Sequence, residues 1–329
     1  MRSLYKIITG DDLLRIDPTK REPLVEGFIY KKDYIMLEAE PKVGKTILTQ
    51  HLTSCMSKGE PFLGVYHIPK PLRVWYFATE GKEDDLKDRW YRINKIVPMD
   101  CNNVFLIPTC FAFNSARGIT CLNEIMEKLK DLPPDIIVID SVYRAIAGKL
   151  TDESVINSFH HQMAILQNEY SCAILLVHHL TKPSYNASTG KKRERGEFDG
   201  FGSVFISAAV DHVFRLEKME KEEETNKDDR VLTCNTQRSG DIITTLRLRL
   251  VEPDPLYFST VSMYEKEKHI VLELIKTSKE GIGISELIKK SSLTRSIIYY
   301  TLSELRKDNC SIVRTGAYNK DVRYKYVKP

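Results

Sequence analysis

Three observations predict an α/β protein with a mostly parallel central sheet and a small C-terminal domain. Residues 39–46 (AEPKVGKT) form a loop sequence between an apolar run and an amphipathic run. Downstream, short apolar runs alternate with helical patterns, as is typical of a parallel sheet covered by helices on both faces. Beyond residue 263 the composition turns basic, with 14 Lys/Arg against 8 Asp/Glu.

Size and composition fit one large core and a small second domain. Of 329 residues, 42% are hydrophobic and 29% are charged, which is ordinary for a globular protein. No apolar stretch approaches the ~18 residues of a membrane span, and Lys6, Asp11 and Asp12 interrupt any signal peptide, so we expect a cytoplasmic protein. The seven cysteines are widely spaced without a C-x-x-C pair, which favours neither disulfides nor zinc.

The expected elements alternate along the first two thirds of the chain. Strands are predicted at 34–37, 73–78, 104–107, 135–140 and 172–177, and helices at 47–58, 82–93, 119–129 and 152–169. From about residue 208 the pattern becomes extended, at 210–216, 231–235 and 244–250, with a charged excursion at 217–230 that indicates an exposed hairpin tip. The sheet should therefore finish with antiparallel strands.

The pattern divides the chain into four parts. An N-terminal arm (1–25) precedes the core domain (26–252), and Pro253 and Pro255 indicate a linker at 253–264. In 265–329, helices at 265–277, 285–290 and 294–307 and an extended pair at 311–314 and 323–327 outline a winged helix.

The loop at 39–46 has the chemistry of a phosphate-binding loop. Its backbone N–H groups and the following helix N-terminus can surround the phosphates of ATP, Lys45 can reach the β- and γ-phosphates, and Thr46 can hold Mg²⁺. The first glycine of the usual pattern is replaced by Ala39, which weakens the match because alanine disfavours positive φ. The predicted nucleotide-binding residues are Ala39, Glu40, Pro41, Lys42, Val43, Gly44, Lys45, Thr46 and Ile47.

Three polar residues follow predicted strands, at the edge where parallel sheets bind ligands. Asp140 is expected to hold Mg²⁺ together with Thr46, although a strand-end aspartate can also be a cap. Glu80 is expected to polarise the attacking water, the alternative being a cap of the next helix. His179 is expected to sense the γ-phosphate rather than only pack, and alternation along the strand sends His178 to the opposite face.

Basic residues further along the chain indicate contacts with a phosphodiester backbone or a neighbouring subunit. A glycine-containing loop downstream of His179 suits single-stranded DNA, the alternative being a solvated charge run. Arg238 follows the strand at 231–235 and can act on the nucleotide of a neighbouring subunit, unless it forms a surface ion pair. The predicted DNA-binding residues of the loop are Lys182, Lys191, Lys192, Arg193, Arg195, Gly202 and Ser203.

In this order, the motifs resemble those of the RecA-fold hexameric helicases, most closely the plasmid RepA group, with DnaB-type replicative helicases as wider relatives. The resemblance covers residues 24–250. It rests on AEPKVGKT (39–46), FATEG (77–81), DIIVIDS (135–141), LLVHHLTKP (175–183), GSVFISAAVDHVFRL (202–216) and NTQRSG (235–240).

The resemblance implies roles for particular residues. Glu80 corresponds to the catalytic base, His179 to the γ-phosphate sensor, and the segment ending at Gly202 and Ser203 to the DNA-binding loop of the central channel. Arg238 matches the arginine finger of the K-x-R motif of DnaB-type relatives, where Thr236 replaces the lysine. Relatives of the RepA group carry a candidate finger just before the G-S pair, where this chain has Gly200 and Phe201.

The leading hypothesis is a DNA-dependent ATPase that forms a ring, a hexamer as the resemblance implies, and acts as helicase or translocase in replication of a plasmid, phage or similar element. The alternative is an ATP-switched DNA-binding regulator or loader without unwinding; a recombinase filament ranks below both. The winged helix is expected to bind duplex DNA through Arg295, Arg306 and Lys307, or else to contact a protein. The only cofactors expected are ATP and Mg²⁺.

Overall fold

The computed structural model describes residues 9–15, 21–180, 204–219, 227–237, 245–261, 265–278 and 280–291, residues 293, 298, 301, 302 and 305, and the strands at 312–315 and 323–326. They fall into two compact units, residues 1–261 and 262–329. Each unit has its own apolar core. The units are described separately.

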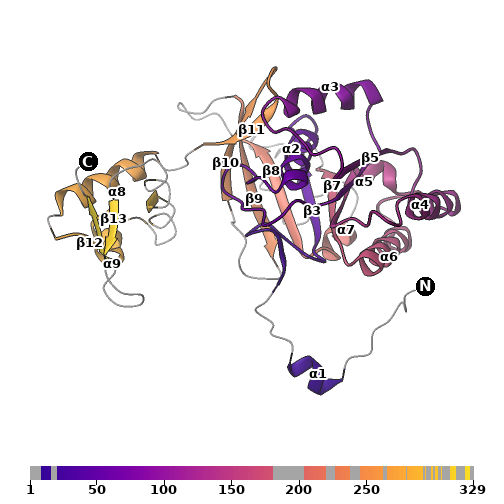
Figure 1. Ribbon diagram of the computed structural model, residues 1–329, viewed down its shortest axis with the longest axis horizontal. Helices are drawn as coiled ribbons and strands as arrows, with labels where there is room; N and C mark the ends of the chain where they lie inside the picture. Colours follow the sequence, from indigo (N-terminus) through magenta and orange to yellow (C-terminus); the bar gives the residue numbers. More distant parts are fainter. Residues whose placement is uncertain are drawn as a thin grey trace, which may run out of the picture. The chain divides into compact units, whose positions relative to one another are not determined.

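The first unit is built on a nine-stranded sheet with the order β11-β10-β9-β8-β3-β7-β6-β4-β5 (Figure 1). Strands β8, β3, β7, β6, β4 and β5 are parallel, and β9, β10 and β11 continue the sheet in antiparallel fashion. The strands are β3 (Tyr34–Ala39), β4 (Val74–Ala78), β5 (Val104–Pro108), β6 (Ile136–Asp140), β7 (Ala173–His179), β8 (His212–Lys218), β9 (Asp229–Gln237), β10 (Thr245–Val251) and β11 (Tyr257–Thr260). The predicted parallel sheet with an antiparallel end is confirmed.

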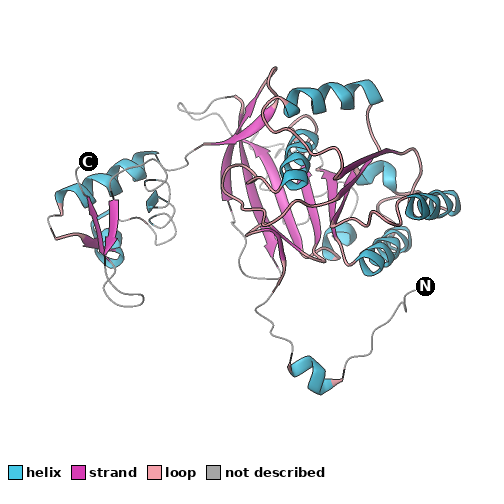
Figure 2. Ribbon diagram, viewed as in Figure 1, coloured by secondary structure: helices cyan, strands magenta, loops and turns pink. Residues whose placement is uncertain are grey.

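Helices cover both faces of this sheet (Figure 2). Side chains of α2 and α3 join one core cluster and those of α4, α5, α6 and α7 the other, so the central strands are buried on both sides. This explains why β4 and β6 consist almost wholly of apolar residues, every one of them buried. The helices are α2 (Lys45–Lys58), α3 (Glu83–Asn94), α4 (Ala116–Lys128), α5 (Val142–Ala145), α6 (Glu153–Tyr170) and α7 (Val204–Ala208), and a short α1 (Gly10–Leu14) precedes them.

Two predicted boundaries are wrong. The segment 253–264, expected to be a linker, contains β11, which pairs with β10 and buries Phe258 in the core of the first unit. The arm at 1–25 ends in β1 (Pro23–Val25), which pairs with β2 (Ile29–Tyr30) and buries Leu24 and Val25. In both places a short strand lies next to prolines or charges, and its pairing partner cannot be read from local periodicity.

The second unit contains α8 (Glu265–Thr277), β12 (Ile282–Gly283), α9 (Ile284–Ser291), β13 (Ile312–Thr315) and β14 (Arg323–Tyr326). Its three strands form a small antiparallel sheet with the order β12-β14-β13. Between α9 and β13, residues Ile298, Leu302 and Leu305 are helical and buried. Their spacing shows that one face of a further helical segment packs into this core.

Candidate nucleotide-binding site

The site is formed at the carboxyl ends of β3, β4, β6 and β7. Register brings the strand ends together: Ala39 pairs with His179, and Ala78 pairs with Asp140. Glu80 follows β4 after one intervening residue. The three strand-end residues singled out in the sequence therefore lie at one edge of the sheet, beside the loop that leaves β3.

The loop between β3 and α2 has the backbone of an anion-binding turn. Lys42 and Gly44 have positive φ angles of 63° and 114°, and Gly44 is the N-cap of α2 without any side-chain cap. The first N–H groups of this 14-residue helix are thus without a capping side chain, and they face the edge where a phosphate would bind. The Lys45 side chain lies back along the loop, where Nζ donates to the carbonyl oxygens of Ala39 at 2.8 Å and Glu40 at 3.0 Å.

Lys45 is 5% exposed, and burial lowers the pKa of its ammonium group to about 8. The carboxylates of Asp140, Glu80 and Glu40 oppose this shift. A buried lysine at a site without bound phosphate is stabilised by an added anion. The electrostatics of the loop thus favour a polyphosphate ligand.

Asp140 lies in a hydrogen-bonded network beneath the loop. The Tyr76 hydroxyl donates to Asp140 Oδ2 at 2.6 Å and lies 3.1 Å from Thr49 Oγ1, and the Thr46 hydroxyl also bonds to the carboxylate. Burial raises the pKa of Asp140, although the hydrogen bonds of Tyr76 and Thr46 lower it. A buried carboxylate of this kind gains stability from a nearby cation.

The donor set fits Mg²⁺ but not a cage made by protein alone. Within the part of the chain that the structure describes, no three His, Cys, Asp or Glu side chains gather as metal ligands. Mg²⁺ is commonly held by one or two protein oxygens together with substrate phosphates. The Thr46 hydroxyl and the Asp140 carboxylate, already in contact, supply such a pair.

Glu80 is fixed between two side chains. Its Oε1 accepts a hydrogen bond of 2.5 Å from Ser141 Oγ, and its Oε2 lies 3.4 Å from His179 Nε2. The bond to His179, together with that from Ser141, lowers the pKa of Glu80 to about 2 despite burial. The carboxylate is therefore ionised and held in place, where it can orient a water molecule. Because it contacts His179, a movement of that ring would change its hydrogen bonds.

His178 and His179 differ as the strand alternation predicts. His178 is buried, at 1% exposure, whereas the side chain of His179 is 29% exposed and faces Glu80. Only His179 therefore lines the candidate site.

The phosphate loop and His179 line a cavity of about 420 Å³. Six of the residues that line it were indicated by the sequence: Lys42, Gly44, Lys45, Thr46, Ile47 and His179. Sequence reasoning missed the remaining lining residues, which are Arg89, Lys218, Lys227, Asp228, Arg230, Leu250 and Glu252. The only signal was the charged stretch around β8 and β9, which we interpreted as an exposed hairpin tip.

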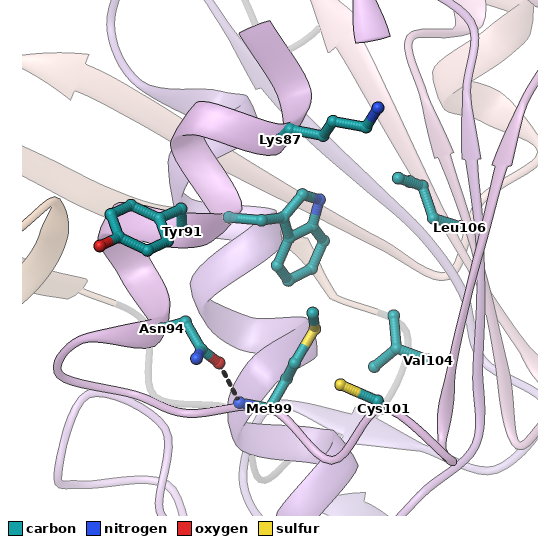
Figure 3. Close-up of a pocket in the computed structure, with 8 residues that line it drawn as sticks. Lys87, Tyr91, Asn94, Met99, Cys101, Val104 and Leu106 are labelled. Carbon is teal, nitrogen blue, oxygen red and sulfur yellow. Dashed lines mark hydrogen bonds between the residues drawn. The ribbon is translucent and has the colours of Figure 1, made fainter. Parts of the chain in front are cut away.

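A second cavity, of about 370 Å³, lies between α3 and the start of β5 (Figure 3). Its lining is mostly apolar and includes Trp90, Met99, Val104 and Leu106, with Lys87 among the few polar members. Asn94 Oδ1 accepts a hydrogen bond from the Met99 backbone N–H at 2.8 Å, which fixes the turn after α3. None of the strand-end residues of the nucleotide site contributes to it.

Several predicted site residues lie outside the described residues. They are Lys182, Lys191, Lys192, Arg193, Arg195, Gly202, Ser203, Arg238, Arg295, Arg306 and Lys307. For Arg238, the preceding strand is informative: Gln237 pairs with His212, and His212 pairs with Ile35 at the start of β3. Strand β9 thus ends at the sheet edge opposite to the loop that holds Lys45.

A phosphate loop, a strand-end aspartate and a strand-end glutamate at one edge of a mostly parallel sheet define a P-loop nucleotide-binding protein of RecA-type fold. The chain belongs to the AAA domain family (AAA_25), whose match covers residues 6–185. The resemblance to RecA-fold helicases and ATPases, predicted from the motifs, is confirmed.

A solved structure, that of a DnaB-like replicative helicase described with its interactions with primase, shares the fold. The TM-score is 0.53 at 14% sequence identity, and the match covers 77% of this chain and 66% of the other. The comparison with curated proteins found no match. No helix among the described residues is long and apolar enough to cross a membrane.

Proposed function

We propose that this protein is a DNA-dependent ATPase, a ring-forming helicase or translocase that acts in DNA replication of a mobile element such as a plasmid or phage. One observation carries the proposal: Glu80 is held between Ser141 and His179 at the same sheet edge as Lys45 and Asp140. This arrangement supplies a phosphate cradle, a metal-binding carboxylate and a water-orienting carboxylate together.

In phosphoryl transfer the protein acts mainly by positioning and by electrostatic stabilisation. The loop N–H groups and Lys45 bind the β- and γ-phosphates. Thr46 and Asp140 would hold Mg²⁺, which neutralises charge on the phosphate oxygens. Glu80 orients the attacking water. Because its pKa is low, it accepts a hydrogen bond from the water as a carboxylate and does not retain the proton.

His179 connects hydrolysis to the chain that follows β7. When the γ-phosphate leaves, the hydrogen bonds of the His179 ring change, and Glu80 Oε2, 3.4 Å away, is within reach as an alternative partner. The segment after Leu180 contains the predicted DNA-binding residues. The proposed motor step is therefore a shift of this segment driven by loss of the γ-phosphate.

In the proposed ring, Arg238 acts on the nucleotide of a neighbouring subunit. Because β9 runs away from its own phosphate loop, an arginine that follows Gln237 is suited to a neighbouring subunit's nucleotide. Assembly into a hexamer is proposed from the DnaB-like fold and this geometry. It is tested by mixing Arg238→Ala with Lys45→Ala protein, where partial recovery of turnover indicates a finger that acts in trans.

The second unit is proposed to be a winged helix that binds duplex DNA. In support, its elements follow the order helix, strand, helix, helical segment and two-stranded wing, with β12 beside β14. Arg306→Ala with Lys307→Ala should weaken duplex binding while leaving ATP turnover intact. Unchanged duplex affinity would favour a protein-binding role for this unit.

The central test is steady-state ATP hydrolysis with single-stranded DNA, with duplex and without DNA. Lys45→Ala should abolish turnover, and Glu80→Gln should retain nucleotide binding but not hydrolysis. Glu83→Gln is the matched control, because Glu83 is an exposed carboxylate at the start of α3 whose partner is Lys87. Normal turnover in Glu80→Gln would exclude Glu80 as the water-orienting group.

The alternative function, an ATP-switched regulator or loader, is distinguished by the same assay. It predicts slow turnover that single strands do not stimulate, together with nucleotide-dependent oligomerisation. Strong stimulation by single strands supports the motor.

A further inference from the structure

Two residues outside the AAA domain match contact the phosphate loop. Arg230 is the second residue of the antiparallel strand β9 and Phe258 lies on the edge strand β11, whereas the match ends at residue 185. Both contact the peptide that joins Val43 to Gly44, in the middle of the loop.

Arg230 is a buried arginine that bonds to backbone rather than to carboxylates. Its Nε donates to the Val43 carbonyl oxygen at 3.1 Å, and its Nη1 donates to the carbonyl oxygens of Lys227 at 2.9 Å and Asp229 at 3.0 Å. The side chain is 4% exposed and lines the nucleotide cavity. It therefore connects the start of β9 directly to the phosphate loop.

The bond to Val43 also fixes the neighbouring N–H. A trans peptide unit is planar, and its C=O and N–H point in opposite directions. When Arg230 holds the Val43 carbonyl, the N–H of Gly44 is directed away from Arg230. In a phosphate-binding loop these N–H groups are the ligands of the anion, so the orientation of this peptide determines whether one of them is available.

Phe258 fixes the same peptide through packing. A Cβ added to Gly44 would lie 2.8 Å from Phe258 Cζ, so the ring rests directly on this glycine. The Phe258 backbone N–H in turn donates to His51 Nδ1 on α2 at 3.4 Å, and Figure 1 shows β11 at the end of the sheet beside α2. The strand that carries the ring is thus hydrogen-bonded to α2, the helix that follows the loop.

We infer that Arg230 and Phe258 are positioning residues that hold the Val43–Gly44 peptide in its phosphate-binding orientation. The antiparallel extension β9–β11 is then part of the nucleotide site rather than an appendage to the sheet. The inference rests on the proposed nucleotide binding for its functional consequence. Its structural content, a loop peptide held from β9 and β11, is testable without nucleotide.

The experiment compares Arg230→Lys and Arg230→Ala with the matched pair Arg73→Lys and Arg73→Ala. Arg73 also donates to a backbone carbonyl, that of Pro133 at 3.1 Å, but it precedes β4 at the opposite edge of the sheet. Two quantities are measured: amide hydrogen exchange of the peptide that spans residues 40–48 without nucleotide, and binding of fluorescent mant-ADP with Mg²⁺. Urea unfolding identifies the variants that fold.

Both Arg230 variants should exchange faster at residues 43–45 and bind mant-ADP about tenfold more weakly, as the loss of a charged hydrogen bond predicts. Exchange across β6 should stay unchanged, and the Arg73 variants should match the wild type in both measurements. Lysine keeps the charge but not the Nε–H that reaches Val43, so equal effects of Lys and Ala identify the hydrogen bond, rather than the charge, as the cause.

Folded Arg230 variants with wild-type loop exchange would overturn the inference. If neither Arg230 variant folds, Phe258→Leu decides, because leucine keeps β11 apolar but places no ring on Gly44; faster loop exchange supports the inference and unchanged exchange refutes it. A wild-type protein that does not bind mant-ADP would refute the proposed function alone. The exchange measurement would still test the positioning role.

Discussion

Protonation of His51 should make the first unit sensitive to acid. The ring is 4% exposed and packs edge-on against Phe62 and Tyr257, with centroid distances of 5.4 Å and 6.2 Å. Burial lowers its pKa from 6.5 to about 4. Its Nδ1 accepts a hydrogen bond from the Phe258 N–H, so protonation would place two N–H donors against each other.

The direction and size follow from linkage. Between pH ~6.5 and ~4 the unfolded chain binds a proton at this site that the folded chain does not, so the free energy of unfolding falls as pH falls through that window. A pKa difference of about 2.5 units corresponds to a loss of roughly 3 kcal/mol in the free energy of unfolding. This loss is complete below pH ~4 and absent above pH ~6.5. His51→Gln should remove this part of the acid sensitivity.

Urea unfolding at a series of pH values from 4 to 7.5 measures the effect. Tryptophan fluorescence reports on the first unit alone, because both tryptophans, Trp75 and Trp90, are buried there. His67→Gln is the control, since His67 is exposed. The same slope of unfolding free energy against pH in His51→Gln and wild type would refute the reasoning.

Three further substitutions have expected outcomes. Gly44→Ala introduces a Cβ 2.8 Å from an aromatic ring at a φ of 114°, so mant-ADP titration should show at least tenfold weaker binding; wild-type affinity would mean that the loop adapts. Glu38→Gln removes the carboxylate of a buried ion pair with Arg215 and should cost roughly 3–5 kcal/mol in urea unfolding, a cost under 1 kcal/mol being incompatible with it. Tyr76→Phe removes the hydroxyl that donates to Asp140 and should cost about 1–2 kcal/mol in the same assay, where an unchanged midpoint would exclude a net contribution.

Most of the correct predictions came from patterns of residues that are adjacent in the sequence. The parallel strands were found because buried strands such as β4 and β6 are continuous apolar runs, and the phosphate loop because its residues are consecutive. Asp140, Glu80 and His179 could be assigned to one edge because carboxyl ends of parallel strands share an edge. Their contacts through Ser141 depend on side-chain geometry that no spacing reveals.

What the sequence did not reveal depends on pairing between distant segments. β11 has four residues, follows two prolines and contacts α2, more than 200 positions earlier, so no local pattern identifies it. Arg230 lies in a run of charged residues typical of a solvent-exposed segment, yet in the fold it is buried and bonds to Val43, 187 positions earlier in the sequence. Tertiary contact, rather than local propensity, determines the role of both.

Strand β11 has a mechanical consequence. Among the described strands it pairs with β10 alone, and it is the last strand before α8, which begins at Glu265 in the second unit. Tension on the chain beyond Thr260 would therefore act first on β11, the strand whose Phe258 rests on Gly44. A load on the second unit would in this way weaken the proposed nucleotide binding.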